Sequence, residues 1–250
     1  MQTSDSLPIT IVIGASGALA SACIHAVSAM ADTSHIVAIS RGRSAIPDTD
    51  RLSYLQCDNS ETDIDKCLAE LAQFRGKINR VIICNGRLHD ENIKPEKRLE
   101  DISAENMMAI MQINTLTPML WMKALAPLLK SPQACVMAVF SARVGSITNN
   151  HLGGWYSYRM SKAALNMGVR STAIEYGRRA KNVRLLAFHP GTTDSPLSRP
   201  FQASVPQGKL FSPAFVANSL LELMQQTANT LEDTPAEATF IDWEHKTIPW

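Results

Sequence analysis

The segment from Trp155 to Leu165 carries a tyrosine and a lysine, Tyr158 and Lys162, that are four residues apart. Residues with this spacing share one face of an α-helix, so both side chains can point at one bound ligand. A tyrosine donates its proton near neutral pH only if its pKa of about 10 is lowered. A lysine charge about 5 Å away stabilises the phenolate by roughly 3 kcal/mol, or about two pKa units. The pair can therefore act as a general acid, and an interfacial tyrosine beside a solvated lysine is the alternative.

A second signal lies near the N-terminus, where the apolar run Ile9–Ile13 enters a turn of small residues and leaves it as a helix-like segment. In such a turn, backbone N–H groups and the positive end of the helix can approach a pyrophosphate. The turn therefore predicts a phosphate site, although tight packing of a helix on a strand also favours small residues. The residues predicted to hold the phosphates are Gly14, Ser16, Gly17, Ala18 and Leu19.

The choice of nucleotide depends on the end of the second predicted strand, which reads Ser40, Arg41, Gly42, Arg43. An NAD site usually has an acidic residue about 20 residues after the glycine turn, which binds the ribose 2′-hydroxyl. That carboxylate is missing here, and a guanidinium suits a 2′-phosphate, so NADP(H) is the predicted cofactor. Asp58 follows the third predicted strand and is placed to accept a hydrogen bond from the adenine amine. The alternatives are solvated loop arginines and a turn or capping role for Asp58.

The elements that must position these residues alternate between short β-rich runs and longer helical runs. Strands are predicted near 9–13, 35–39, 52–57, 80–84, 134–140, 183–188 and 237–241. Helices are predicted near 17–30, 61–73, 103–129, 155–179 and 213–227. This alternation indicates one doubly wound α/β domain over residues 1–250, with a parallel seven-stranded sheet. Segment 41–51 is too short for a full crossover helix, and segment 190–211 is predicted to be a long surface segment without regular structure.

Composition limits the classes of partner. Hydrophobic residues make up 45% and charged residues 19% of the 250 residues, enough apolar material for a large core. Lys and Arg total 24 against 23 Asp and Glu, so no overall field favours nucleic acid. The five cysteines include no CxxC pair and are expected to be reduced core residues of a cytoplasmic protein, with no metal site. The uncharged run from Leu7 to Ala31 is broken by proline and glycine, so neither a membrane span nor a signal peptide is expected.

Taken together, these motifs resemble the short-chain dehydrogenase/reductase family over essentially the whole chain. Within the family, segments 141–147, 153–162, 189–191 and 248–250 look most like the carbonyl-reductase and C-factor-like branch. The resemblance implies a Rossmann fold and hydride transfer between NADP(H) and a carbonyl or secondary alcohol of a small molecule. It also implies a homodimer or homotetramer, with helices near 103–129 and 155–179 in the interface. The further matching residues are Asn85, Gly86, Asn114, Ser141, Pro190 and Gly191.

The resemblance also implies a role for each matched residue. Tyr158 would protonate the carbonyl oxygen, while Lys162 would hold the ribose hydroxyls and lower the pKa of the tyrosine. Asn114 would bend its helix and hold a water of a proton relay, and Asn85 with Gly86 would contact the cofactor. The residues expected to cover the nicotinamide are Pro190, Gly191 and Thr193.

Two departures from the family pattern affect the predicted site. Alanine replaces two of the usual glycines in the first turn, a small intrusion that is expected to leave cofactor binding intact. The residue aligned with the family's catalytic serine is Ala142, so a hydroxyl that orients the carbonyl must come from Ser141 or Ser146. Ser141 is preferred, provided that the backbone has already turned, since adjacent residues of a strand point to opposite faces.

Two further interpretations complete the set of hypotheses. His189 follows a predicted buried strand and is expected to be a packed histidine whose ring is satisfied by backbone groups. The alternative to an enzyme is a nucleotide-binding signalling or regulatory protein of the C-factor-like type, with little turnover. Consumption of NADPH with aldehydes and ketones distinguishes the two functions.

Overall fold

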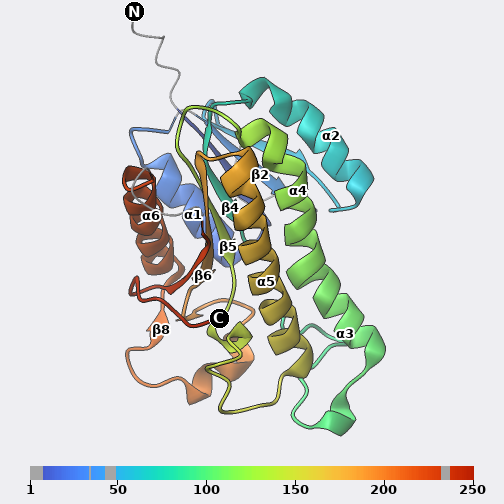
Figure 1. Ribbon diagram of the computed structural model, residues 1–250. Helices are drawn as coiled ribbons and strands as arrows, with labels where there is room; N and C mark the ends of the chain where they lie inside the picture. Colours follow the sequence, from blue (N-terminus) through green and yellow to red (C-terminus); the bar gives the residue numbers. More distant parts are fainter. Residues whose placement is uncertain (1–7, 34, 43–48, 232–236) are drawn as a thin grey trace, which may run out of the picture.

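A parallel sheet forms the centre of the computed structural model, which describes residues 8–33, 35–42, 49–231 and 237–250. The sheet has seven strands in the order β3-β2-β1-β4-β5-β6-β9 (Figure 1). All neighbouring strands in it are parallel, which confirms the predicted doubly wound α/β fold. The strands are β1 (Ile9–Ile13), β2 (His35–Ser40), β3 (Leu52–Gln56), β4 (Ile78–Ile83), β5 (Cys135–Phe140), β6 (Val183–His189) and β9 (Thr239–Asp242).

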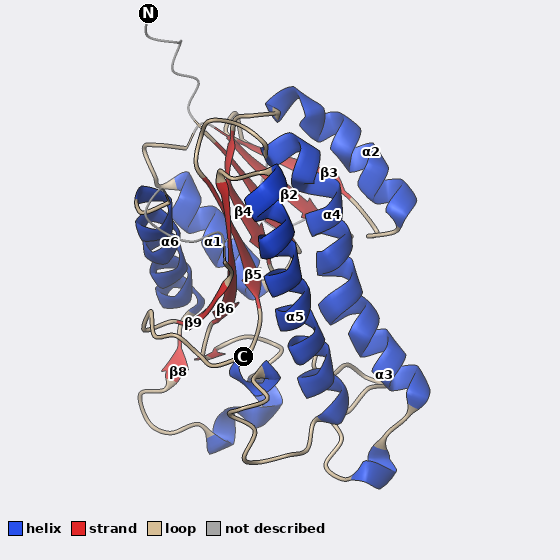
Figure 2. Cartoon of the chain, in the orientation of Figure 1, coloured by secondary structure: helices blue, strands red, loops and turns tan. Residues whose placement is uncertain are grey.

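Helices cover both faces of this sheet (Figure 2). Helices α1 and α6 pack together on one face, and α2, α4 and α5 pack on the other. None of the described helices is long and apolar enough to cross a membrane. The helices are α1 (Ala18–Ser28), α2 (Glu61–Leu71), α3 (Ala104–Met111), α4 (Thr117–Leu129), α5 (Tyr156–Arg179) and α6 (Pro213–Asn229).

Strand β1 shows why the sequence forms this sheet. All five of its residues are buried, as expected for a central parallel strand covered on both faces. Its side chains alternate between two apolar cores: Ile11 and Ile13 join the core under α4 and α5, and Val12 joins the core under α1 and α6. Because β1, β4, β5 and β6 are parallel neighbours, their carboxyl ends lie at one edge of the sheet. The segments that follow these ends carry the polar residues.

The helix predicted near 103–129 is interrupted. Residues Gln112–Leu116 form a π-helical turn between α3 and α4, in which Asn114 is buried. The Thr117 hydroxyl donates to the Gln112 carbonyl over 2.9 Å and so satisfies a group that the wider turn leaves free. The wider turn at Asn114 is consistent with the local bend expected there.

The segment from Pro190 to Phe211 contains regular structure, so the prediction of a segment without it is wrong. Strands β7 (Thr192–Thr193) and β8 (Leu210–Phe211) pair in parallel, and a 3₁₀ turn spans Arg199–Ser204. These strands have two residues each, too few to produce a visible sequence period. The expected absence of a helix in segment 41–51 concerns mainly residues 43–48, which lie outside the described part of the chain.

Gly191 allows this segment to leave the sheet. Its φ of +70° is in the left-handed region that favours glycine. A Cβ atom at this position would lie 2.6 Å from the Phe211 ring and 2.9 Å from the Trp243 ring. The ring centres of Phe211 and Trp243 are 4.9 Å apart. The backbone at Gly191 therefore packs against an aromatic pair formed by two later segments of the chain.

Candidate active site

Helix α5 brings Tyr158 and Lys162 to the carboxyl edge of the sheet, where both line a cavity of about 720 Å³. The Lys162 Nζ donates to the Phe140 carbonyl over 2.8 Å and lies 5.9 Å from the centre of the Tyr158 ring. Burial lowers the pKa of Lys162 to about 7 and raises the pKa of Tyr158 above its ordinary value. Desolvation therefore outweighs the attraction between phenolate and ammonium in the protein alone.

The cavity collects most of the residues predicted to contact substrate and nicotinamide. Its wall beside Tyr158 is apolar, with Leu88 and Ala142 in the same buried cluster. The predicted site residues that line it are Leu19, Asn85, Gly86, Ser141, Tyr158, Lys162, Pro190, Gly191 and Thr193. The predicted site residues outside its lining are Gly14, Ser16, Gly17, Ala18, Ser40, Arg41, Asp58 and Asn114.

The turn after β1 has the form that a phosphate site requires. Gly14 has a φ of +80°, and a Cβ there would lie 3.2 Å from the Asn85 backbone nitrogen. The N–H groups of Gly14 and Ala15 both donate to the Ile39 carbonyl, at 2.9 and 3.0 Å. Helix α1 begins after Gly17, which makes no side-chain cap. The N–H groups of its first turn are therefore available to an anion.

The end of β4 lies between this turn and helix α5. Asn85 Oδ1 is buried and has no hydrogen-bond partner among the described residues. A Cβ on Gly86, the residue after Asn85, would lie 3.7 Å from Lys162 Nζ. Asn85 and Lys162 are therefore near each other in the cavity wall. A buried acceptor without a partner is costly and suits a ligand that donates a hydrogen bond. The turn at Gly14, the end of β4 and Lys162 thus fit an extended dinucleotide.

The residues predicted to bind the adenosine end lie at the carboxyl ends of β2 and β3. The Ser40 hydroxyl donates to the Gly42 carbonyl. Arg41 is exposed, and Arg43 lies outside the described residues. Asp58 accepts a hydrogen bond from the Ser60 N–H over 2.7 Å, and its hydrogen bonds to Ser60 lower its pKa. Asp58 therefore has the turn role that the sequence left open.

Asn114 joins the loop after β4 to helix α5 instead of facing the cavity. Its Oδ1 accepts from the Arg87 N–H over 2.7 Å, and its Nδ2 donates to the Arg87 carbonyl over 2.8 Å. Nδ2 also donates to the Ser161 hydroxyl over 2.9 Å. Since Ser161 precedes Lys162, the buried amide fixes the loop relative to the lysine.

Neither candidate serine directs its hydroxyl proton at a substrate. The Ser141 hydroxyl donates to Asn166 Oδ1, and the Ser146 hydroxyl donates to the Pro249 carbonyl, both over 2.5 Å. Ala142 is extended, with φ −152° and ψ 145°, so the backbone has not turned at this point. The methyl group of Ala142 packs near Tyr158, while Ser141 lines the cavity and Ser146 does not.

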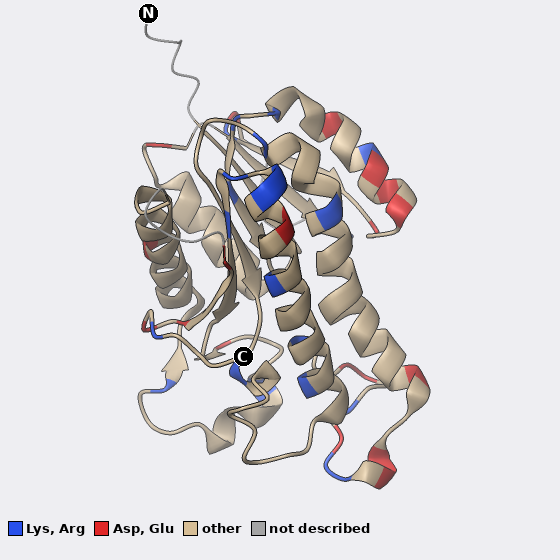
Figure 3. Ribbon diagram, viewed as in Figure 1, with Lys and Arg blue, Asp and Glu red and all other residues tan. Residues whose placement is uncertain are grey.

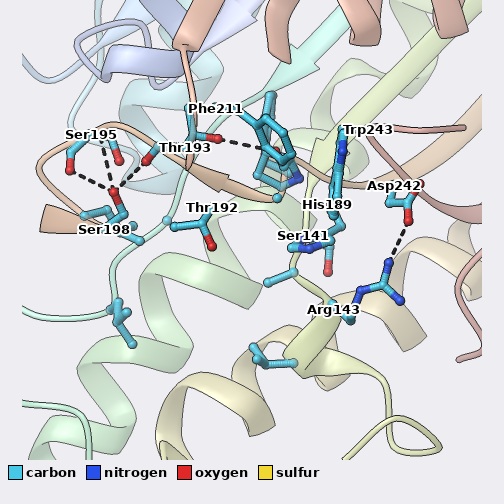
Figure 4. Close-up of a pocket in the computed structure, with 18 of the residues that line it drawn as sticks. Ser141, Arg143, His189, Thr192, Thr193, Ser195, Ser198, Phe211, Asp242 and Trp243 are labelled. Atoms are coloured by element: carbon cyan, nitrogen blue, oxygen red, sulfur yellow. Dashed lines mark hydrogen bonds and ion pairs between the residues drawn. The ribbon is translucent and has the colours of Figure 1, made fainter. Parts of the chain in front are cut away.

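The expectation for His189 is wrong. Its Nδ1 is buried without a hydrogen-bond partner in the part of the chain that the structure describes. Its ring lines the cavity and packs edge-on against Trp243, with ring centres 5.3 Å apart (Figure 4). Burial lowers the pKa of His189 to about 3, so the imidazole is neutral at physiological pH.

Sequence reasoning missed Glu96, whose carboxylate caps helix α5. Glu96 is buried, and its carboxylate accepts from both the N–H of Ser157, over 3.2 Å, and the Ser157 hydroxyl. The residue before α5, Trp155, has a φ of +52° and no side-chain cap of its own. Its N–H donates to the Glu96 carbonyl over 2.5 Å. The cap comes from 61 residues away, so no local capping pattern reveals it.

We expect Glu96→Ala to destabilise the protein and to lower its turnover, because the Ser157 donors lose their acceptor one residue before Tyr158. A buried donor without a partner costs about 1–3 kcal/mol, and each kcal/mol lowers the Tm of a domain of this size by about 2–4 °C. Thermal unfolding and kcat measure the effect. Glu96→Gln keeps an acceptor and is expected to recover much of the loss, and the exposed Glu100→Ala is the control. Equal Tm values for Glu96→Ala and Glu100→Ala would contradict the capping role.

Comparisons with known proteins agree with this geometry. The C-signal of Myxococcus xanthus is 35% identical over 102 residues, which cover 41% of this chain and 60% of the relative. A 1-hydroxy-2-glutathionyl-2-methyl-3-butene dehydrogenase of Rhodococcus sp. (strain AD45) is 31% identical over 137 residues, or 53% of this chain and 56% of the relative. The chain thus spans less than two thirds of the length of these relatives.

Solved structures share the fold over nearly the whole chain. A short-chain dehydrogenase/reductase from Burkholderia multivorans with bound NADP has a TM-score of 0.79 at 23% identity, covering 97% of this chain and 99% of that chain. The carbonyl reductase Sniffer of D. melanogaster has a TM-score of 0.80 at 19% identity, covering 98% of this chain and 100% of that chain. Residues 40–231 match the family model for enoyl-(acyl carrier protein) reductase. The chain therefore belongs to the short-chain dehydrogenase/reductase family.

Proposed function

We propose that the protein is an NADP(H)-dependent oxidoreductase that transfers hydride between the nicotinamide and a carbonyl or secondary alcohol of a small molecule. One observation carries the proposal: Tyr158 and Lys162 line one cavity from the same face of α5. Asn85 and Gly86 connect that cavity to the phosphate turn at Gly14. A proton donor, a cation and a dinucleotide site are thus contiguous.

The mechanism assigns a task to each group. Bound NADPH supplies the hydride. The Tyr158 hydroxyl gives its proton to the substrate oxygen as negative charge develops there. Lys162, held by the Phe140 carbonyl, binds the ribose hydroxyls, and hydrogen bonds to these hydroxyls favour its charged form. The Lys162 ammonium then stabilises the phenolate that forms when Tyr158 loses its proton.

The other predicted site residues hold the nucleotide and shape the site. Asn114 is a positioning residue, because its amide fixes the loop after β4 against α5. The turn from Gly14 to Leu19 binds the pyrophosphate, with Ser40, Arg41 and Asp58 toward the adenosine. Pro190, Gly191 and Thr193 cover the nicotinamide. Ser141 lines the cavity and accepts hydrogen bonds there through its oxygen.

The test is NADPH consumption by purified protein with a panel of aldehydes and ketones. The similarity to C-signal favours a second candidate, a nucleotide-binding regulatory protein with little turnover. The replacement of the usual serine by Ala142 is consistent with either function. Turnover with any member of the panel supports the enzyme, and NADPH binding without turnover on all of them supports the regulator.

We expect Arg41→Ala to weaken NADPH binding about tenfold and to change NADH binding less than twofold. A charge-assisted hydrogen bond to the 2′-phosphate contributes about 1.5 kcal/mol, and NADH lacks that phosphate. Titration of nucleotide fluorescence measures both Kd values. Arg178→Ala removes another exposed arginine, from the last turn of α5, and is the control. Equal losses for the two nucleotides would contradict the 2′-phosphate assignment.

The proposal includes a homodimer or homotetramer in the cytoplasm. Helix α4 carries Lys123 as its single charged residue and is almost free of charge in Figure 3. Large apolar side chains stay exposed on α3, α5 and the turn between α3 and α4, and they suit a second copy of the chain. These residues are Met108, Leu116, Met160, Met167 and Ile174. The five free cysteines suit a reducing compartment.

A further inference from the structure

The cavity contains a polar group that the proposed chemistry does not use. We propose that His189 binds a second oxygen atom of the substrate, so that the preferred substrates are carbonyl compounds with a hydroxyl or second carbonyl group a few bonds from the reacting one. The inference rests on the proposed function, since it names the substrate class of the same cavity.

The position of His189 places its ring near the reacting groups. It is the last residue of β6, and the parallel register pairs Phe140 of β5 with Phe188 of β6. The Ser141 N–H donates to the Phe188 carbonyl over 2.8 Å, so Ser141 and His189 leave the sheet side by side (Figure 4). The next residue after Ser141 is Ala142, which shares a buried cluster with Tyr158. His189 and Tyr158 thus line the same cavity from neighbouring elements of the fold.

The ring of His189 has hydrogen-bonding capacity that this chain leaves unused. Nδ1 has no partner among the described residues, and Trp243 offers the ring only an aromatic edge-to-face contact. Arg143, which also lines the cavity, is paired with Asp242 over 2.6 Å. A neutral imidazole has one donor and one acceptor, and an unpaired buried nitrogen costs free energy that a ligand hydrogen bond recovers.

The cavity wall that packs directly against Tyr158 is apolar. Trp155 and Phe201 pack with ring centres 4.9 Å apart and form an apolar wall next to Tyr158. The Ser141 hydroxyl donates its hydrogen bond to Asn166 Oδ1 and not to a group in the cavity. A substrate with a single oxygen uses Tyr158 and leaves His189 unpaired, whereas a second oxygen satisfies it. A site with a buried polar group discriminates against a ligand that lacks the matching group.

The experiment compares two ketones that differ by one carbonyl group, 1-phenyl-1,2-propanedione and propiophenone, with NADPH. For His189→Leu we expect kcat/KM for the diketone to fall about 10- to 100-fold, mainly through KM, and kcat/KM for propiophenone to change less than about threefold. His189→Asn keeps a polar atom near the Nδ1 position and is expected to retain much of the preference. His151→Leu, at an exposed histidine, is the control.

Each other outcome overturns the inference. Equal losses of kcat/KM for both ketones would show a general effect of the substitution on the site. A rise in the Kd of NADPH that matches the loss of kcat/KM would show that His189 binds the nucleotide. Wild-type reduction of propiophenone but not of the diketone excludes the substrate class. If His189→Leu fails to fold, His189→Phe, which keeps an aromatic ring against Trp243 but removes both nitrogens, gives the same comparison. Failure of the proposed function is distinguishable, because wild-type protein would then consume no NADPH with any member of the panel.

Discussion

Tyr158→Phe is expected to lower kcat for carbonyl reduction by about 10²–10⁴-fold, the usual contribution of a positioned general acid. The substitution removes only the hydroxyl. The ring keeps its packing against Leu88 and Ala142 and its edge contact with Trp155, whose ring centre is 6.3 Å away. NADPH affinity is therefore expected to stay within about threefold of the wild type. Steady-state rates and nucleotide titration, both on the purified protein, measure the two quantities.

The same helix offers a matched control for this result. Tyr176 is also buried in α5, but its hydroxyl donates to the Met122 carbonyl and it does not line the cavity. Tyr176→Phe is expected to lower stability by about 1 kcal/mol and to leave kcat unchanged. A Tyr158→Phe variant that turns over at the wild-type rate would rule out the tyrosine as the acid.

Gly145→Ala is expected to reduce stability and turnover together. The added Cβ would lie 2.7 Å from the carbonyl carbon of Lys162, 2.8 Å from its Cβ and 3.0 Å from the nitrogen of Ala163. Two of these atoms belong to the backbone of α5, so the helix or the 3₁₀ turn at Gly145 must shift. Overpacking of this kind costs about 1–3 kcal/mol, and a displacement near 1 Å at a catalytic group costs on the order of 100-fold in rate. Thermal unfolding and kcat measure the two effects.

Gly168→Ala separates this clash from a general effect of alanine in place of glycine. Its Cβ would meet the Met119 side chain, whose thioether is flexible and can move aside. Alanine also raises helix propensity by about 1 kcal/mol in the interior of α5. We expect unchanged kcat and an equal or higher Tm for Gly168→Ala. Wild-type Tm and kcat in Gly145→Ala would show that the contact with Lys162 does not fix the lysine.

Sequence periodicity predicted the elements whose signals are local. The five apolar residues of β1 and the four-residue spacing of Tyr158 and Lys162 both follow from the geometry of strand and helix. Ser141 was different: the direction of its hydroxyl depends on the backbone at Ala142, which is extended, and on Asn166 from α5. No pattern within one segment contains that information.

The features that the sequence did not predict depend on contacts between distant segments. Glu96 meets Ser157 only after the loop following β4 has packed on α5. His189 has the surroundings of an ordinary buried strand end, and only the completed cavity shows that no backbone group of the described residues reaches its Nδ1. Strands β7 and β8 pair only two residues each across a separation of 18 residues, so they have no measurable period.

The aromatic contact at Gly191 limits how a substrate can enter. The chain is anchored there by Phe211 and Trp243, and the pairing of β7 with β8 ties the two ends of the 192–211 segment together. Swinging the segment outward as one piece would preserve that pairing, but it would separate Phe211 from Trp243 and from the backbone at Gly191. An entrance on this side that keeps these contacts must form through rearrangement between residues 194 and 209, while Gly191 stays in place.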